Sequence, residues 1–126
     1  MEGRGYILIK SMKKIIIAFD VDWTLRREDW NPNSMLPNSR IVELLKILST
    51  FKNIKIIVWS WAGQEWADEC VNTFNIREYI WKTASKNHQG KVDGKHIFEP
   101  DIFPDIAIDD IQDCSLGVLN LIVKEK

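Results

Sequence analysis

The feature that most constrains the fold is an apolar run, residues 15–19, that ends in the acidic pair Asp20 and Asp22. A near-continuous apolar run is typical of a strand buried on both faces in a parallel sheet. Side chains alternate along a strand, so two acids two residues apart lie on one face where the strand meets solvent. Like charges this close repel each other unless a cation offsets them. The pair therefore predicts a carboxylate nucleophile beside a divalent cation with oxygen ligands, by default Mg²⁺.

Strand signals alternate with helix signals along the rest of the chain. We expect strands at residues 15–20, 54–59, 78–82, 104–109 and 118–123. We expect helices from Asn38 or Ser39 to Leu48, at 65–74 and at 111–116, with polar connections at 26–37 and 84–104. This alternation predicts an α/β fold, namely a three-layer α/β/α Rossmann-like sandwich around a mostly parallel five-stranded sheet.

The length of 126 residues suits one domain with a single core. We expect this domain to span residues 12–126, because Met12-Lys13-Lys14 looks like a natural start directly before the first strong strand. Residues 1–11 are then an N-terminal extension, native or not, or they form, through the apolar residues 6–9, an extra short strand. The sequence leaves both interpretations open.

The formal net charge of -1 gives no overall electrostatic attraction to nucleic acid or to an anionic membrane. A local basic patch that binds either of them is still compatible with this charge. No apolar run approaches the length of a membrane span, and residues 1–14 lack the apolar segment of a signal peptide. Cys70 and Cys114 form neither a disulfide framework nor a metal-ligand pair by their spacing. We therefore expect a cytoplasmic protein.

Polar side chains follow several of the expected strands at the end where parallel sheets bind ligands. They are Asp20 and Asp22 after the first strand, Ser60 after the second, Lys86 after the third, and Asp109 and Asp110 after the fourth. Each of them alone is an ordinary turn residue. Two carboxylate pairs, a hydroxyl and a lysine at one edge of a sheet are much less common, and together they favour a functional site.

These residues also carry a resemblance to the haloacid dehalogenase superfamily, whose phosphatase members share four short motifs. The matches are Asp20, Asp22 and Thr24 for Asp-x-Asp-x-Thr, Ser60 for a Ser or Thr after a hydrophobic strand, Lys86 for a lysine, and Asp109 and Asp110 for an acidic pair after a strand. The resemblance spans roughly residues 13–123 and implies a fold like the one expected above.

The resemblance implies a phosphatase that acts on phosphoric monoesters. In such an enzyme Asp20 would attack the phosphorus and form an aspartyl-phosphate, while Asp22 would protonate the leaving oxygen and then activate water. Thr24, Ser60 and Lys86 would bind the phosphoryl oxygens. An acid two residues after the nucleophile favours phosphatase chemistry, because dehalogenases and ion-pumping ATPases of the superfamily usually lack it.

The resemblance also implies Mg²⁺ as the cofactor. The ion would be held by Asp20, by the backbone carbonyl of Asp22, and by Asp109 or Asp110. Asp113 lies four residues after Asp109 and fits a variant of the fourth motif, in which it would contribute through water. Which of the three later acids contacts the ion directly stays open.

Two positions depart from the family pattern. Lys86 competes for the third motif with Lys91 and Lys95, and also with Lys82. Lys86 ranks first because it lies just past the third expected strand. Trp23 stands between Asp22 and Thr24, where the family commonly has Gly, and its ring would narrow or line the mouth of the site.

Three tryptophans, Trp23, Trp30 and Trp61, lie near the motif loops. Packing is the more ordinary role for such residues, and stacking on a nucleobase or sugar is the alternative.

The chain has no room for the cap domain that many superfamily members insert after the first or second motif. A site without a cap is expected to be open to solvent, which suits large phosphorylated substrates or a lid from another subunit. Small substrates and an oligomeric state stay open, and no membrane partner is expected.

Two other functions compete with the phosphatase. One is a catalytically silent domain of the same fold that binds phosphate groups or a protein. The other is a receiver-like phosphoacceptor domain, which would need an Asp at the end of the third strand, where this chain has none.

Overall fold

The structure is a computed structural model, and it describes residues 13–27, 31, 34–98, 101–110, 116–117 and 119–123. The expected extension at 1–11, with its possible short strand, lies outside these residues. Trp30, Asp113 and most of the expected helix at 111–116 also lie outside them.

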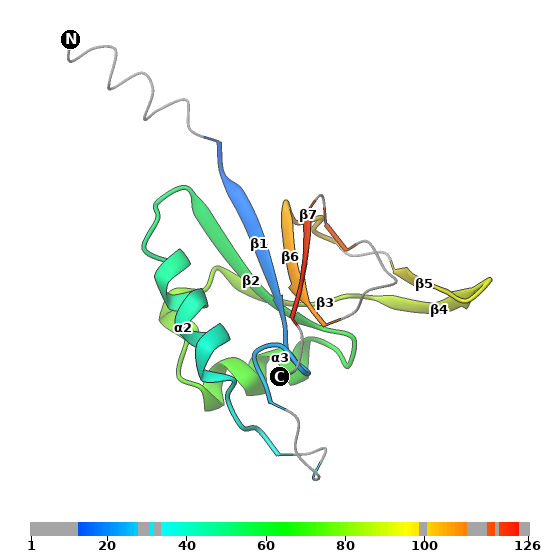
Figure 1. Cartoon of the computed structure of the whole chain (residues 1–126), viewed down its shortest axis with the longest axis horizontal. Helices are drawn as coiled ribbons and strands as arrows, with labels where there is room; N and C mark the ends of the chain where they lie inside the picture. The colour runs from blue at the N-terminus through cyan, green and yellow to red at the C-terminus, as the bar shows by residue number, and fades with distance from the viewer. Residues whose placement is uncertain are drawn as a thin grey trace.

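Five strands form one parallel sheet in the order β3-β2-β1-β6-β7 (Figure 1). They are β1 (Ile15–Asp20), β2 (Ile54–Ser60), β3 (Lys82–Ser85), β6 (Ile106–Asp109) and β7 (Leu119–Ile122). β1 lies in the middle and its last four residues are buried, which explains its apolar sequence. Because every pairing is parallel, the strands all end at the same edge of the sheet. The expected α/β fold with a five-stranded sheet is confirmed.

Two helices, α2 (Ser39–Leu48) and α3 (Gln64–Thr73), pack on one face of this sheet. Their buried side chains share a core with alternate residues of the strands. This core contains Val42 and Leu45 of α2, Ala67, Cys70 and Val71 of α3, and Ile17, Phe19, Ile56 and Val58 of the sheet. The expected helices in these two regions are confirmed within a residue or two, and Asn38 occupies the N-cap position of α2 without a side-chain cap hydrogen bond.

The opposite face of the sheet carries a second, smaller core. It contains Ala18, Ile57, Trp59 and Ala107, with Leu116 packed against them. No helix covers this face among the residues that the structure describes. The structure therefore establishes the sheet and one helical layer.

The prediction of a strand at residues 78–82 is wrong. Residues Arg77–Tyr79 form a turn of 3₁₀ helix, η1, and the strand begins at Lys82. Tyr79 and Ile80 pack against the helix-side core from this turn, so their apolar character reflects core packing without strand pairing. The shift places the end of β3 at Ser85, directly before Lys86.

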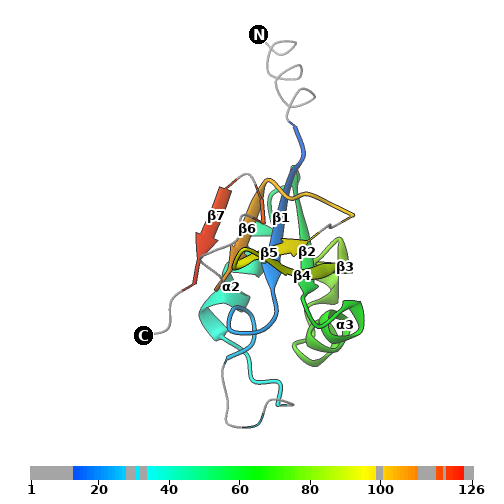
Figure 2. The ribbon, with the colours of Figure 1, turned by 90° about the vertical axis from the view of Figure 1, so that its right-hand side faces the viewer.

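A β-hairpin lies in the segment that was expected to be an irregular connection. Its strands are β4 (His88–Val92) and β5 (Lys95–Phe98), and the pair projects from the sheet on the side away from α2 (Figures 1 and 2). Asp93 and Gly94 join the strands with φ angles of 52° and 78°. Positive φ at both loop residues is the geometry of a type I′ turn, and Asp-Gly is a strong sequence signal for it. This signal was present in the sequence and could have predicted the hairpin.

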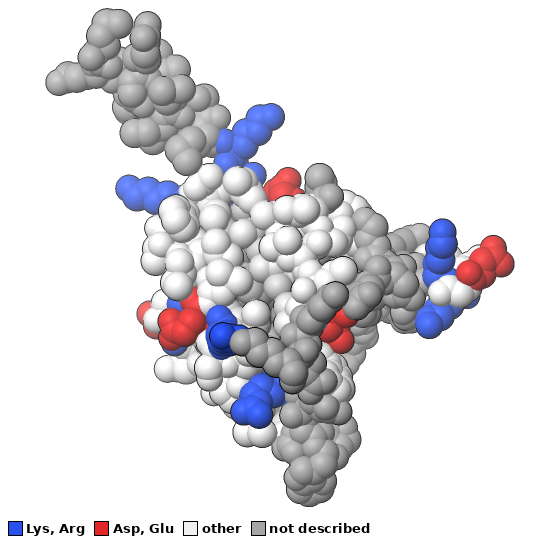
Figure 3. All heavy atoms as spheres, in the orientation of Figure 1, with Lys and Arg blue, Asp and Glu red and all other residues white. Residues whose placement is uncertain are grey.

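Neither described helix has the length and apolar content that crossing a membrane requires. On the face of the molecule that Figure 3 shows, the Lys and Arg side chains that are drawn lie at several separate places and form no single broad patch.

Candidate active site

The chain after β1 folds back in a tight turn that fixes the first acidic residues. The backbone N–H of Leu25 donates to the carbonyl of Asp20 (3.2 Å), and the N–H of Arg26 donates to the carbonyl of Val21 (2.8 Å). Trp23 within this turn has a φ of 66°, in the left-handed region that glycine favours. A residue with a Cβ carries strain in this geometry, so the turn is one that Gly would suit better than Trp.

Lys86 connects two acids that the sequence separates widely. It follows β3, and its Nζ lies 2.7 Å from Oδ1 of Asp20 and 2.5 Å from Oδ2 of Asp109. The ring centroids of Trp61 and Trp59 lie 4.8 Å and 5.7 Å from the same Nζ. The ammonium is thus enclosed by two carboxylates and two aromatic faces, which together offset the cost of burying its charge.

The other candidate lysines lie elsewhere. Lys91 and Lys95 are exposed residues of the β4–β5 hairpin. Lys82 is exposed at the start of β3, with its Nζ 5.4 Å from the ring centroid of Trp81. Of the four lysines considered from the sequence, Lys86 is the one that the structure places against the acids.

The two acids that contact Lys86 form a cluster with a third acid, Asp110. Asp20, Asp109 and Asp110 each offer an oxygen atom, and these atoms lie within 4.8 Å of one another. The N–H of Asp110 donates to Oδ1 of Asp109 (2.7 Å), which orients the second carboxylate. The cluster holds three carboxylates, and the ammonium of Lys86 contacts two of them, so it carries an excess of negative charge when all three are ionised.

The electrostatics of the cluster follow from burial and from this charge excess. Burial raises the pKa of Asp20 well above its ordinary value, the charge of Lys86 opposes the rise, and the charge of Asp109 adds to it. Burial, together with the hydrogen bond and charge of Asp109, raises the pKa of Asp110 to about 6. A cation placed among these carboxylates would favour their ionised forms.

The donor set fits a hard divalent cation. Oxygen atoms from carboxylates are the ligands that Mg²⁺ and Ca²⁺ take in proteins, and three of them lie within reach of one ion. Each carboxylate oxygen has two lone pairs, so on Asp20 the hydrogen bond from Lys86 leaves room for a metal. The arrangement is compatible with a metal ion without selecting which one.

Thr24 and Ser60 differ in how they relate to the cluster. The hydroxyl of Thr24 donates to Oδ2 of Asp20 (3.3 Å). The hydroxyl of Ser60 instead accepts from the N–H of Ala62 (3.0 Å), while the carbonyl of Ser60 accepts from the N–H of Lys86 (3.1 Å). Ser60 therefore connects to the site through its backbone, and its hydroxyl shapes the turn before α3.

The carboxylate of Asp22 lies apart from the three-acid cluster. Its Oδ1 accepts hydrogen bonds from Nη1 of Arg26 and from the indole N–H of Trp66, both at 3.1 Å. The side chain is 40% exposed. The sequence analysis assigned no functional role to Arg26 or Trp66; the spacing of four residues between Asp22 and Arg26 was the available signal.

The expectation of a site open to solvent is wrong for its central side chains. Asp20 is 2% exposed, Lys86 is 0% exposed and Asp109 is 3% exposed. Trp59 and Trp61 cover the ammonium of Lys86 on the face of the sheet that lacks described helices. Asp110 and Asp22 are only partly buried, so they mark the accessible side of the site.

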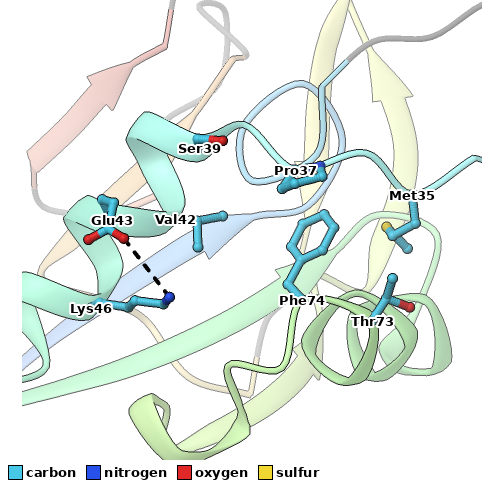
Figure 4. Close-up of a pocket in the computed structure, with 8 residues that line it drawn as sticks. All are labelled: Met35, Pro37, Ser39, Val42, Glu43, Lys46, Thr73 and Phe74. Atoms are coloured by element: carbon cyan, nitrogen blue, oxygen red, sulfur yellow. Dashed lines mark ion pairs between the residues drawn. The ribbon is translucent and has the colours of Figure 1, made fainter.

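A separate hollow of about 360 Å³ lies between α2, the end of α3 and residues 35–37 (Figure 4). Its walls are formed by Met35, Pro37, Ser39, Val42, Glu43, Lys46, Thr73 and Phe74. The charged groups there are Glu43 and Lys46, which pair with each other at 4.0 Å. The hollow contains none of the motif residues, so the acidic cluster is the better candidate for chemistry.

No known protein family, curated protein or solved structure matches this chain at a significant level.

Proposed function

We propose that the protein is a Mg²⁺-dependent phosphomonoester hydrolase of the haloacid dehalogenase type, acting through an aspartyl-phosphate. The observation that carries the proposal is the contact of Lys86 with Asp20 and Asp109, beside Asp110, at the carboxyl edge of a parallel sheet. This edge is where sheets of this kind bind ligands. The proposal includes the three-layer fold of this type, of which the structure describes the sheet and one helical layer.

In the first step, a carboxylate oxygen of Asp20 attacks the phosphorus. The bond from phosphorus to the leaving oxygen breaks, and that oxygen takes the electron pair and a proton from Asp22. The charge of Lys86 favours the ionised form of Asp20 and would also offset charge on the phosphoryl group. The hydroxyl of Thr24 steadies the nucleophile through its hydrogen bond.

In the second step, water attacks the aspartyl-phosphate and gives a proton to Asp22. The bond between phosphorus and Asp20 breaks, inorganic phosphate leaves, and both acids return to their starting states. Asp20, Asp109 and Asp110 would hold the Mg²⁺, which supplies positive charge to stabilise the phosphoryl oxygens.

Hydrolysis of 4-nitrophenyl phosphate tests the proposal. We expect turnover that requires Mg²⁺ and that is abolished in Asp20→Asn, because the neutral amide is not a nucleophile. Asp101 is an exposed acid outside the cluster, so Asp101→Asn is the matched control and should retain wild-type turnover. Turnover in a folded Asp20→Asn protein would contradict the assignment of the nucleophile.

A catalytically silent phosphate-binding domain is the second candidate, and the burial of Asp20 and Lys86 is the observation that favours it. Beryllofluoride mimics a phosphoryl group on a carboxylate and distinguishes the two functions. With Mg²⁺ present, a phosphatase should show a higher melting temperature in beryllofluoride, and this rise should be lost in Asp20→Asn. Absence of both the rise and any turnover would favour the silent domain.

A further inference from the structure

We propose that Arg26 and Trp66 are positioning residues that hold Oδ1 of Asp22, so that Oδ2 is the oxygen that exchanges the proton. This inference rests on the proposed function, because it concerns the acid and base of that reaction. The two residues come from different elements. Arg26 ends the turn after β1, and Trp66 lies in the first turn of α3.

The two donors converge on a single oxygen. Nη1 of Arg26 and the indole N–H of Trp66 each lie 3.1 Å from Oδ1 of Asp22. Within the described part of the chain, no donor contacts Oδ2, and the side chain is 40% exposed. The carboxylate therefore has one anchored oxygen and one that a substrate or water can approach. Fixing a proton donor in one orientation removes an entropic cost from the reaction.

Arg26 also ties this carboxylate to the connection that follows β1. Its Nε donates to the carbonyl of Ser34 (2.5 Å) and its Nη2 donates to the carbonyl of Asn31 (3.3 Å). Its guanidinium carbon lies 5.8 Å from the ring centroid of Trp66. The side chain is only 6% exposed, and its fork of donors serves three acceptors at once. A lysine, with one compact ammonium, cannot reproduce this geometry.

Arg26 and Trp66 donate to Asp22, whose carboxylate is not part of the three-acid cluster, and this separates two kinds of effect. A loss of nucleophile or metal affects every phosphate ester. In the first step, a misplaced general acid affects mainly esters whose leaving oxygen needs a proton, whereas hydrolysis of the aspartyl-phosphate is common to all esters. Dependence on the leaving group is therefore a readout that general damage to the fold does not reproduce.

The experiment compares phenyl phosphate, a poor leaving group, with 2,4-dinitrophenyl phosphate, a good one, in the Mg²⁺-loaded protein. Trp66→Phe removes the N–H donor and keeps an aromatic ring. We expect kcat/KM, which reports phosphoryl transfer to Asp20, to fall about tenfold or more for phenyl phosphate and to change little for the dinitrophenyl ester. Arg26→Lys should show the same selectivity. Trp81→Phe, at an exposed tryptophan, and Arg77→Gln, at an exposed ion pair, are matched controls that should not show it.

A measurement on the metal-free protein tests the contact without activity. In a ¹⁵N-labelled protein, the indole signal of Trp66 is identified by its loss in Trp66→Phe. We expect Asp22→Asn to shift this signal clearly, and Asp101→Asn to leave it unchanged. A Trp66 signal that does not respond to Asp22→Asn would overturn the proposal.

The outcomes separate the inference from the function on which it rests. A wild-type protein that hydrolyses neither ester contradicts the proposed function and, with it, the role of Asp22. A wild-type protein that hydrolyses both, with kcat/KM for the two esters falling equally in Trp66→Phe and Arg26→Lys, overturns the positioning role alone. A selective loss with phenyl phosphate supports both.

Discussion

The ammonium of Lys86 lies 2.7 Å from the carboxylate of Asp20, and both side chains are buried, at the end of two strands that are not neighbours in the sheet. This ion pair joins β3 to β1 across β2. It also places a positive charge beside an acid whose pKa is raised by burial. Stability and chemistry of the site therefore depend on the same contact.

Replacement of Lys86 by Met should destabilise the metal-free protein at neutral pH. The change leaves Asp20 and Asp109 buried without their common partner, and breaking a buried pair in this way costs about 3–5 kcal/mol. Urea unfolding in EDTA measures the loss. Lys91→Met on the exposed hairpin is the matched control and should change stability little.

Mg²⁺ should recover part of this loss, because the ion would replace the missing positive charge. We expect Mg²⁺ to raise the melting temperature of Lys86→Met more than that of the wild type. An equal response of the two proteins would contradict a shared electrostatic role for the lysine and the metal.

The Trp23→Gly variant should be more stable to unfolding than the Trp23→Ala variant. Its φ of 66° strains any residue with a Cβ, at a cost of about 1 kcal/mol. Trp23→Gly and Trp23→Ala both lose the indole ring, so urea unfolding of the two variants isolates this backbone strain. Trp81 is similarly exposed and is not a positive-φ residue, so at that control position Ala should be more stable than Gly. The opposite order at Trp23 would refute the strain.

Ionisation of Asp110 should lower the free energy of unfolding of the metal-free protein as the pH rises through the acidic range. Its folded pKa of about 6 lies above the ordinary value of 3.8, so between these values the folded state retains a proton that the unfolded state releases. Stability from this group is therefore fully present below the ordinary pKa and is lost as pH rises through the folded pKa. Asp110→Asn should flatten the dependence.

Melting curves in EDTA across this pH range, for the wild type and Asp110→Asn, give the comparison. Mg²⁺ should reduce the difference at the upper end of the range, because a bound cation favours the ionised carboxyl. Identical pH profiles for the two proteins would rule out the raised pKa.

Cys70 should be an unreactive thiol in the folded protein. Burial, with smaller contributions from the charges of Asp22 and Asp20, raises its pKa to about 12, so the reactive thiolate is scarce near neutral pH. In a Cys114→Ser protein that has this single thiol, iodoacetamide should label Cys70 only under unfolding conditions. Because the folded pKa exceeds the ordinary 9.0, stability from this group is lost as pH rises above that value. Rapid labelling without denaturant would contradict the burial.

Much of the fold could be predicted from local sequence patterns. The apolar run of β1, the helical stripes of α2 and α3 and the polar residues at the strand ends each reflect a short-range periodicity. The pattern failed at Tyr79 and Ile80, which pack against the core from a 3₁₀ turn and so resemble a strand in composition alone. It also failed at Asp93 and Gly94, where the turn signal was read as an irregular connection.

The sequence by itself determined that Asp20, Lys86 and Asp109 would lie at one edge of a sheet, because parallel strands all end at the same edge. Tertiary structure alone decided which of these groups meet. Lys86 reaches Asp20 across 66 positions of the chain, and no local pattern encodes a contact of that range. Likewise, the turn at Trp23 and the placement of α3 bring Asp22 into hydrogen-bonding contact with Arg26 and Trp66. The carboxylate of Asp22 therefore lies apart from that of Asp20. Strand alternation ends where the strand ends, so beyond Asp20 the direction of each side chain is set by turn geometry and packing.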